Sequence, residues 1–232
     1  MKYVLITGAG GGLGLELVKE HLRQPGWHVF ALPHRPTPEL SALAETYGGA
    51  LDVVACDVGS TASVEEALRA VGQKTGRLHR IFNNAGIHRF ADWVPLDETE
   101  IDFLPQMYNV NAVGPLRVVK AALPLIGAET VLIHISSEAA SLTDQTAVIG
   151  YAYAMSKAAL NMGARILDNW LAPRGTRTLL IHPGRMRTAM QGAHSNIDPW
   201  ETSASLMRLL EKLEDVPRTQ LFMDYRGDPM HW

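Results

Sequence analysis

The chain has 232 residues, a length at which single-domain α/β folds are common. Its 21 basic and 24 acidic residues give a formal net charge of -3 and form no run of like charge, which argues against a nucleic-acid or anionic-membrane partner and favours a small-molecule substrate. A single cysteine, Cys56, excludes an internal disulfide, and we expect it in the core of a cytoplasmic protein. The apolar stretch at residues 3–6 is too short for a signal peptide, and no stretch reaches membrane-spanning length, so no membrane partner is expected.

Short β-branched runs alternate with longer amphipathic stretches along most of the chain. The expected strands cover residues 2–6, 28–32, 51–55, 79–83, 130–135, 177–182 and 220–223. The expected helices cover residues 13–24, 38–47, 61–75, 97–109, 112–126, 152–172 and 200–213. This alternation predicts an α/β fold, a Rossmann-type doubly wound parallel sheet of about seven strands with helices on both faces, in one domain over residues 1–232.

A loop of very small residues links the first expected strand to the first expected helix, and it contains Thr7, Gly8, Gly10, Gly11, Gly12, Leu13 and Gly14. Such a turn lets backbone N–H groups and a helix N-terminus approach a pyrophosphate. The glycine spacing differs from the commoner G-x-G-x-x-G, and a flexible turn without a ligand is the alternative interpretation. Its position directly after the first strand favours a dinucleotide cofactor.

The end of the second expected strand indicates which cofactor is preferred. An acidic residue about twenty positions after the glycines usually holds the ribose 2′-hydroxyl of NAD. Here that position is His34, followed by Arg35, and the first carboxylate downstream is Glu39. An arginine and a protonated histidine attract a 2′-phosphate, so NADP(H) is predicted over NAD(H). A solvated loop arginine is the alternative interpretation.

Tyr153 and Lys157 lie four residues apart on one expected helix, with their Cβ atoms roughly 5 to 6 Å apart. A nearby cation favours phenolate and lowers the pKa of a tyrosine, which makes it a usable acid or base. Such a pair also arises by chance, so it needs support. The support comes from Asn111, which opens a helix, from the segment 83–86 after the fourth strand, and from Ser136-Ser137 at the end of the fifth. These positions converge at the carboxyl edge of a parallel sheet, although each also has a purely structural role as a turn or cap.

Together these residues resemble the short-chain dehydrogenase/reductase family over essentially the whole chain. The matching set is Thr7-Gly8-x-x-x-Gly12-x-Gly14, Cys56-Asp57-Val58, Asn83-Asn84-Ala85-Gly86, Asn111, Ser137, Tyr153-x-x-x-Lys157 and Pro183-Gly184. The stretches 151–161 and 222–227 look like the C-factor and sniffer-like carbonyl reductase branch.

The resemblance implies roles for these residues. Tyr153 would exchange a proton with the substrate oxygen as hydride passes to or from the nicotinamide, and Ser137 would polarise that oxygen. Lys157 would lower the Tyr153 pKa and bind the nicotinamide ribose, while Asn111 would hold a proton-relaying water. The implied cofactor contacts further along the chain are Asp57, Val58, Asn84, Ala85, Gly86, Pro183, Gly184, Met186 and Thr188. The sequence departs from the family pattern at two positions that bear on NADP(H). Gly11 stands where many NADP-preferring members carry a basic residue, and Arg35 lies one position after the place expected for an arginine, which His34 occupies.

The substrate is expected to be an aldehyde, ketone or secondary alcohol with apolar bulk, under a small lid between Thr188 and Trp200. Residues that line its pocket, or simply pack, are His88, Phe90, Trp93, Met190 and Trp200. Scattered histidines and a single thiol indicate no metal site. The resemblance implies a homodimer or homotetramer through the helices at 112–126 and 152–172.

Two other functions stay open from the sequence. One is a cofactor-bound regulatory or signalling protein with little turnover, which does not require all of Asn111, Ser137, Tyr153 and Lys157. The other is an epimerase or dehydratase that uses the same tyrosine and lysine, although those relatives usually need a larger substrate domain than the residues after 184 provide.

Overall fold

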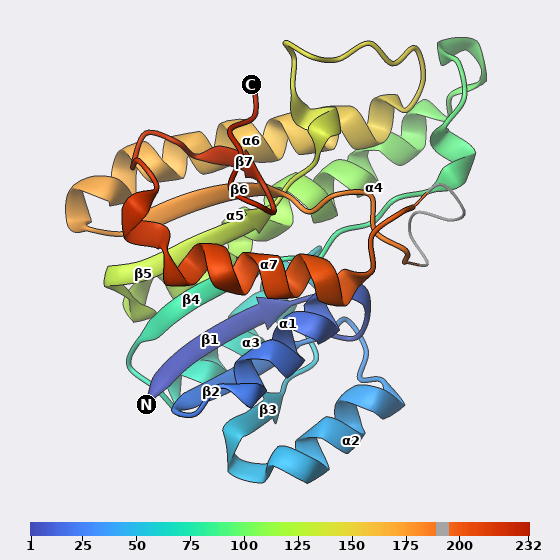
Figure 1. Cartoon of the computed structure of the whole chain (residues 1–232). Coiled ribbons are helices and arrows are strands. Elements are labelled where there is room, and N and C mark those ends of the chain that lie inside the picture. The colour runs from blue at the N-terminus through green and yellow to red at the C-terminus, as the bar shows by residue number, and fades with distance from the viewer. Residues whose placement is uncertain (189–194) are drawn as a thin grey trace.

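The computed structural model describes residues 1–188 and 195–232, and these form a seven-stranded parallel sheet (Figure 1). The sheet order is β3-β2-β1-β4-β5-β6-β7, so successive strands add outward from β1 in one direction and then, from β4, in the other. The strands are β1 (Lys2–Thr7), β2 (Trp27–Leu32), β3 (Leu51–Val53), β4 (Leu78–Asn83), β5 (Ile126–Ile135), β6 (Arg177–His182) and β7 (Phe222–Asp224). The predicted doubly wound sheet is confirmed.

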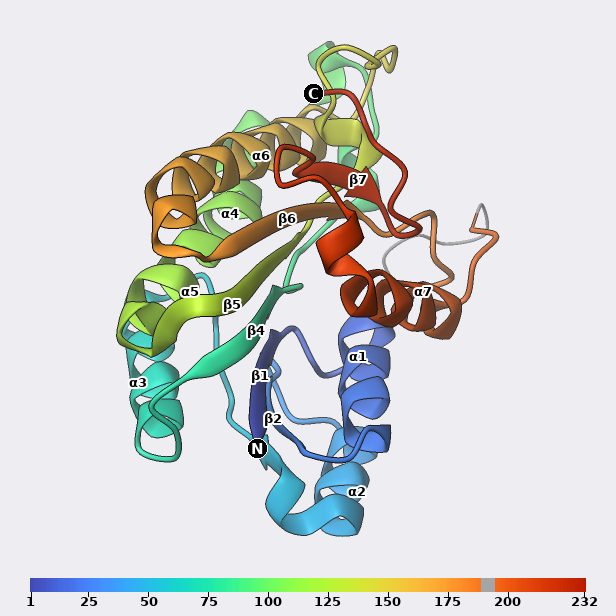
Figure 2. The ribbon, with the colours of Figure 1, turned by 60° about the vertical axis from the view of Figure 1, so that its left-hand side comes forward.

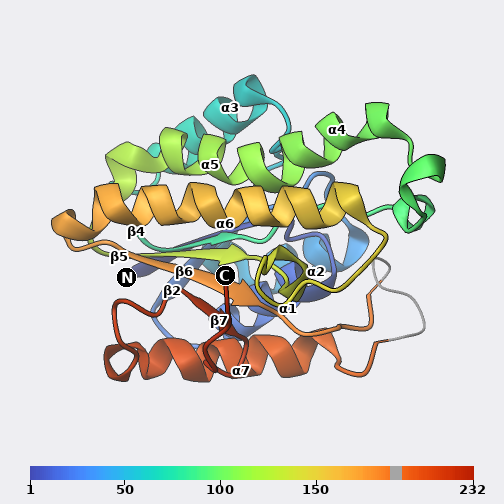
Figure 3. The same ribbon diagram turned by 90° about the horizontal axis from the view of Figure 1, so that it is seen from above.

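Helices cover both faces of this sheet (Figures 2 and 3). One face carries α1 (Gly12–Arg23), α2 (Pro38–Tyr47) and α7 (Pro199–Glu211). The opposite face carries α3 (Thr61–Gly72), α4 (Leu104–Tyr108), α5 (Gly114–Ala122) and α6 (Tyr151–Leu171). Because both faces are covered, the central strands are apolar on both sides, as in parallel sheets generally.

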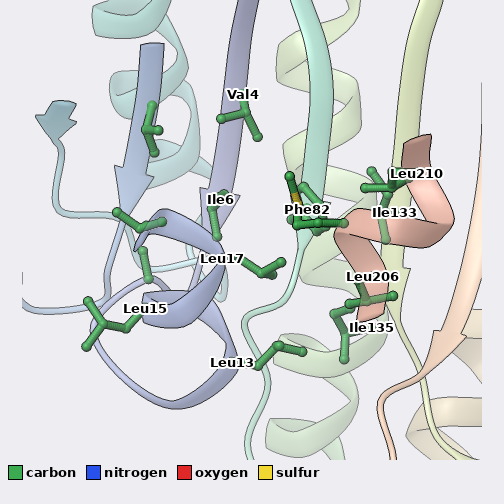
Figure 4. Close-up of a cluster of buried hydrophobic side chains, with 14 of the residues drawn as sticks. Val4, Ile6, Leu13, Leu15, Leu17, Phe82, Ile133, Ile135, Leu206 and Leu210 are labelled. Atoms are coloured by element: carbon green, nitrogen blue, oxygen red, sulfur yellow. The ribbon is translucent and has the colours of Figure 1, made fainter. Parts of the chain in front are cut away.

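The core beneath α1 and α7 shows why these segments pack together (Figure 4). Val4 and Ile6 of β1 point into it, and Leu17 of α1 and Leu206 of α7 meet them there, all nearly or fully buried. Leu5 points to the other face and belongs to the core beneath α3 and α5. This alternation along β1 holds the loop after Thr7 at the edge of the sheet.

One pair of predicted helices differs from the structure. Residues 97–109 do not form one helix: two 3₁₀ turns, Leu96–Glu98 and Ile101–Phe103, precede the short α4. From α4 the chain continues through a π turn, Asn109–Val113, directly into α5. The cause is Pro115, which has no N–H to donate to the carbonyl of Asn111, so the regular α-helical pattern is interrupted there. Asn111 therefore lies within a helical run and does not open a helix.

Two buried histidines predict that the fold weakens in acid. Burial and the charge of Arg80 lower the pKa of His21 to about 3, and burial and the charge of Lys157 lower that of His134 to about 4. Both folded-state values lie below the unfolded value of about 6.5. The free energy of unfolding is therefore unaffected by these histidines above pH 6.5. Below that pH it falls by about 1.4 kcal/mol per pH unit for each histidine, until the pH reaches the folded-state pKa.

Urea unfolding at pH 7 and pH 5 measures this loss. In a His21→Gln variant, part of the loss between the two pH values should disappear, because the buried imidazole no longer has to be protonated. A variant that loses as much unfolding free energy between pH 7 and pH 5 as the wild type would contradict the assignment to His21.

Candidate active site

A cavity of about 300 Å³ lies at the carboxyl ends of β1, β4, β5 and β6. It sits where the strand order reverses, between β1 and β4, which is where ligands bind in open α/β sheets. The predicted residues that line it are Gly8, Gly11, Gly12, Leu13, Asn84, Ala85, Gly86, Tyr153, Lys157, Pro183, Gly184, Met186 and Thr188. The fold thus brings together segments that are far apart in the sequence.

The glycine turn has the shape that a dinucleotide requires. Gly8 and Gly12 have positive φ angles, 65° and 52°, which favour glycine. A Cβ atom on Gly14 would lie 2.3 Å from the carbonyl oxygen of Gly8, so the turn closes only with glycine there. Gly11 is the N-cap of α1 and offers no side-chain acceptor, so the first N–H groups of the helix are available to an anion. These residues fit the pyrophosphate of a nicotinamide dinucleotide.

Thr7 holds the two cofactor loops together without lining the cavity. Its hydroxyl donates to the carbonyl of Phe82 (3.2 Å) and accepts the backbone N–H groups of Asn84 and Ala85, both at 3.1 Å. The Asn84 amide donates to the carbonyls of Thr7 (2.9 Å) and Gly8 (3.3 Å). The motifs after β1 and β4 are therefore one hydrogen-bonded unit.

Tyr153 and Lys157 line this cavity, and Ser137 interacts with the tyrosine. The hydroxyl groups of Tyr153 and Ser137 are hydrogen-bonded to each other. Lys157 is buried, and its Nζ donates to the carbonyl of Ile135 at 2.8 Å and lies 5.7 Å from the centroid of the Tyr153 ring. Ser136 also lines the cavity, but its hydroxyl donates to Oδ1 of Asn161 at 2.6 Å. Only Ser137 of the serine pair thus reaches the tyrosine, as the alternation of strand side chains predicts.

Asn111 is fixed close to this group. Its amide donates to the carbonyl of Ile87 (2.9 Å) and to the hydroxyl of Ser156 (3.0 Å), and its Oδ1 accepts the N–H of Ile87 at 2.8 Å. A Cβ atom on Gly86 would lie 3.3 Å from Asn111 Oδ1 and 3.8 Å from Lys157 Nζ, which shows how near these groups are. The side chain of Asn111 is therefore fully engaged in hydrogen bonds within the protein.

The ionisation of the tyrosine and lysine reflects their burial. Burial raises the pKa of Tyr153, the bond with Ser137 opposes that rise, and the charge of Glu138 adds to it. Burial lowers the pKa of Lys157 to about 8. The sequence predicts that Lys157 lowers the Tyr153 pKa, and the structure differs, because loss of hydration of the phenolate dominates. Tyr153 therefore carries its proton at neutral pH and can donate it.

Several predicted cofactor residues lie outside the cavity lining. Gly10 and Gly14 form the back of the turn, and Asp57 and Val58 follow β3, with Asp57 Oδ1 accepting the N–H of Gly59 at 2.8 Å. His34 and Arg35 are exposed in the loop after β2. That loop is joined to the turn, because Thr37 donates to the carbonyl of Gly10 at 3.0 Å. A Cβ atom on Gly10 would lie 3.3 Å from the Arg35 carbonyl oxygen.

Tyr153 also lines a second cavity, of about 430 Å³, together with Trp93 and the segment that precedes α6. His88 packs edge-on against the Tyr153 ring, with their centroids 5.0 Å apart. Trp200 lies on α7, more than half exposed, and lines neither cavity. The side chain of Phe90 and all of Met190 lie outside the described residues. His88 and Trp93 are thus the predicted pocket residues that the fold brings to the tyrosine.

The model of the family described as short chain dehydrogenase matches residues 2–198. The chain belongs to this family. C-signal of Myxococcus xanthus is 34% identical over 160 residues, which are 68% of this chain and 95% of that protein. The carbonyl reductase Sniffer of D. melanogaster has a TM-score of 0.90 at 27% identity and covers 100% of both chains. A carbonyl reductase from Pseudomonas aeruginosa PAO1 in complex with NADP has a TM-score of 0.81 at 31% identity, again over 100% of both chains.

Some site residues of this short-chain dehydrogenase were not singled out from the sequence. Ile87 and Ile135 act through backbone groups, which residue types do not reveal. Glu138 and Arg185 line the second cavity, and their only sequence signal is that they follow Ser137 and Gly184 directly.

Among the described residues, no group of histidine, cysteine, aspartate and glutamate is arranged to hold a metal ion. No helix within that part of the chain is long and apolar enough to cross a membrane. The outer face of α6 exposes Met155, Met162, Ile166 and Trp170. This apolar surface lies on the helix through which self-association is predicted.

Proposed function

We propose that the chain reduces the carbonyl group of a small, partly apolar aldehyde or ketone with NADPH, in the reversible reaction of an alcohol dehydrogenase. The observation that carries this proposal is the position of Tyr153. Its hydroxyl is bonded to Ser137, and the residue borders both the glycine-lined cavity and the second cavity. A proton donor therefore lies between the cofactor cavity and a place for a substrate.

The nicotinamide, when bound, supplies the hydride for reduction or accepts it for oxidation. The Tyr153 hydroxyl donates its proton to the substrate oxygen, and Ser137 donates a hydrogen bond to the same oxygen as negative charge develops there. Lys157, held by the Ile135 carbonyl, provides a positive charge close to the phenolate that Tyr153 leaves behind. A water held at Asn111 replaces that proton.

The loop after β2 supports NADP(H) over NAD(H). It carries Arg35, and the nearest downstream carboxylate, Glu39, is paired with Lys19 at 2.7 Å. Arg35 is exposed and belongs to a loop bonded to the glycine turn through Thr37. A 2′-phosphate at this end of the cofactor would meet a guanidinium and no free acid. The P. aeruginosa relative in complex with NADP agrees with this preference.

Arg35→Glu tests the coenzyme preference. We expect the dissociation constant of NADPH to rise by roughly ten- to a hundredfold, because a charge-assisted phosphate contact is replaced by repulsion. The dissociation constant of NADH should change little. Arg69→Glu, which reverses an exposed charge on α3, should change neither dissociation constant. Fluorescence titration of both coenzymes measures the effect. An equal change for NADPH and NADH would contradict the role of Arg35.

A second candidate is a cofactor-bound signalling protein, which the likeness to C-signal favours. Tight NADPH binding without turnover of any aldehyde, ketone or diketone would support it over the reductase.

A further inference from the structure

The second cavity is lined by both charged and apolar side chains. Trp93, Ile149 and Met230 contribute apolar surface, whereas Glu138 and Arg185 contribute opposite charges. Arg185 comes from the segment after β6, and Glu138 from the residue next to Ser137. If the proposed function is right, this cavity receives the substrate, because it borders the proton-donating hydroxyl of Tyr153.

The exposed side chain of Arg185 pairs with Glu138, and the backbone of Arg185 is bonded to a later segment of the chain. Its Nε donates to Oε1 of Glu138 at 2.7 Å. Its backbone carbonyl accepts the N–H of Asn196 at 3.1 Å, and the next residue, Met186, forms a β-bridge with Ile197. Within residues 1–188 and 195–232, the terminal nitrogens Nη1 and Nη2 have no hydrogen-bond partner. The side chain is therefore anchored through Nε, and the two terminal nitrogens keep their donors.

Glu138, the anchor of Arg185, is itself held near the reacting group. Its backbone N–H donates to Nδ1 of His182 at 3.2 Å. Its carboxylate is close enough to the Tyr153 phenol to raise the pKa of that hydroxyl, and it directly follows Ser137, which is bonded to the tyrosine. A carbonyl compound seated at Tyr153 thus has Arg185 in the wall of the same cavity.

The wall holds two carboxylates, Glu138 and Asp144, and one guanidinium, Arg185. The carboxylate of Asp144 is already paired with His231, at 3.0 and 3.2 Å. A cationic substrate would have to compete with Arg185 for Glu138. An anion would meet the Nη1 and Nη2 donors of Arg185, which have no partner among the described residues.

We propose that Arg185 selects carbonyl substrates that carry an anionic group, a carboxylate above all, at the end remote from the reacting carbon. A planar carboxylate accepts two parallel N–H bonds from a guanidinium fork, which gives both orientation and affinity. This inference rests on the proposed function and adds a substrate class, the oxo acids, to it.

Three para-substituted benzaldehydes, one anionic, one neutral and one cationic, test the selection: para-carboxybenzaldehyde, para-formylbenzamide and (para-formylphenyl)trimethylammonium. Each is reduced with NADPH by the wild type, by Arg185→Gln and Arg185→Lys, and by Arg187→Gln. Arg187 is the matched control, since it lies two residues away, is ion-paired with Asp198 at 3.1 Å and lines neither cavity.

The wild type should prefer the carboxylate. Arg185→Gln should lower kcat/KM for the carboxylate-bearing aldehyde by roughly ten- to a hundredfold, mainly through KM. The kcat/KM for the amide-bearing aldehyde should change by no more than about twofold. Arg185→Lys should recover part of the loss, because it restores charge but not the fork. Arg187→Gln should behave as the wild type. Equal rates on all three aldehydes, a preference for the cation, or an equal loss on the amide would each overturn the inference.

A binding measurement that needs no turnover separates this inference from the proposed function. Calorimetry on the protein saturated with NADP⁺, which cannot reduce an aldehyde, compares para-carboxybenzaldehyde with para-formylbenzamide. Tighter binding of the carboxylate that disappears in Arg185→Gln supports the inference even if no aldehyde is reduced. If para-formylbenzamide is reduced and neither assay shows a preference for the carboxylate, the proposed reductase function is retained and the role of Arg185 is rejected.

Discussion

Tyr153→Phe should reduce the turnover of aldehydes and ketones by about a hundredfold or more, because positioned proton donors commonly contribute 10²- to 10⁴-fold. The substitution removes the hydroxyl that is bonded to Ser137 and keeps the ring against His88. NADPH binding should survive, since the glycine turn and Lys157 are unchanged. Stopped-flow or steady-state assays of NADPH oxidation, with a parallel fluorescence titration of the coenzyme, measure both quantities.

Tyr151→Phe is the matched control for this variant. Tyr151 begins the same helix, is half-buried and lines neither cavity. Its loss should leave turnover within about twofold. Turnover by Tyr153→Phe close to that of the wild type would show that another group donates the proton.

Gly14→Ala should destabilise the fold and weaken coenzyme binding together. The new methyl group would lie 2.3 Å from the carbonyl oxygen of Gly8 and 2.6 Å from the amide nitrogen of Asn84. The turn must therefore open, at a cost of about 1–3 kcal/mol or more for an overpacked site. For a chain of this size, that corresponds to a fall in Tm of roughly 2–12 °C. Circular dichroism melts with and without NADPH measure the loss and the remaining ligand stabilisation.

Gly11→Ala isolates the effect of crowding in the same turn. Gly11 has an extended backbone, and a Cβ atom there would meet nothing within 4 Å. The Tm of the free protein should stay within about 2 °C of the wild type. If the two alanine variants melted alike, the close packing of Gly14 against Gly8 would not be what shapes the turn.

The sheet and much of the candidate site follow from short-range features of the sequence. The alternation of apolar strands and amphipathic helices predicts the doubly wound sheet, because strands buried on both faces must be apolar. The i, i+4 spacing of Tyr153 and Lys157 requires only that residues 151–171 be helical, which they are. The location of Ser137 and of the Asn84 segment at the site follows from the rule that the carboxyl ends of parallel strands share one edge of the sheet.

Three other features could not be predicted in the same way. The π turn around Asn111 arises from Pro115 within a helix that the sequence pattern divides in two. The direction in which the Tyr153 pKa shifts depends on burial, which cannot be read from the four-residue spacing of Tyr153 and Lys157. The contact between Glu138 and Arg185 joins segments 47 positions apart, and neither residue belongs to a recognisable motif. The fold alone brings that pair to the second cavity.

The central claim is tested most directly by following the hydride itself. NADPH carrying deuterium at the transferable position would be incubated with the protein and a panel of aromatic and aliphatic aldehydes, ketones and diketones, and the products examined by mass spectrometry. The proposed function predicts an alcohol that carries the deuterium on its former carbonyl carbon. NADPH that binds tightly without yielding a labelled alcohol from any carbonyl compound would contradict it and favour the signalling role.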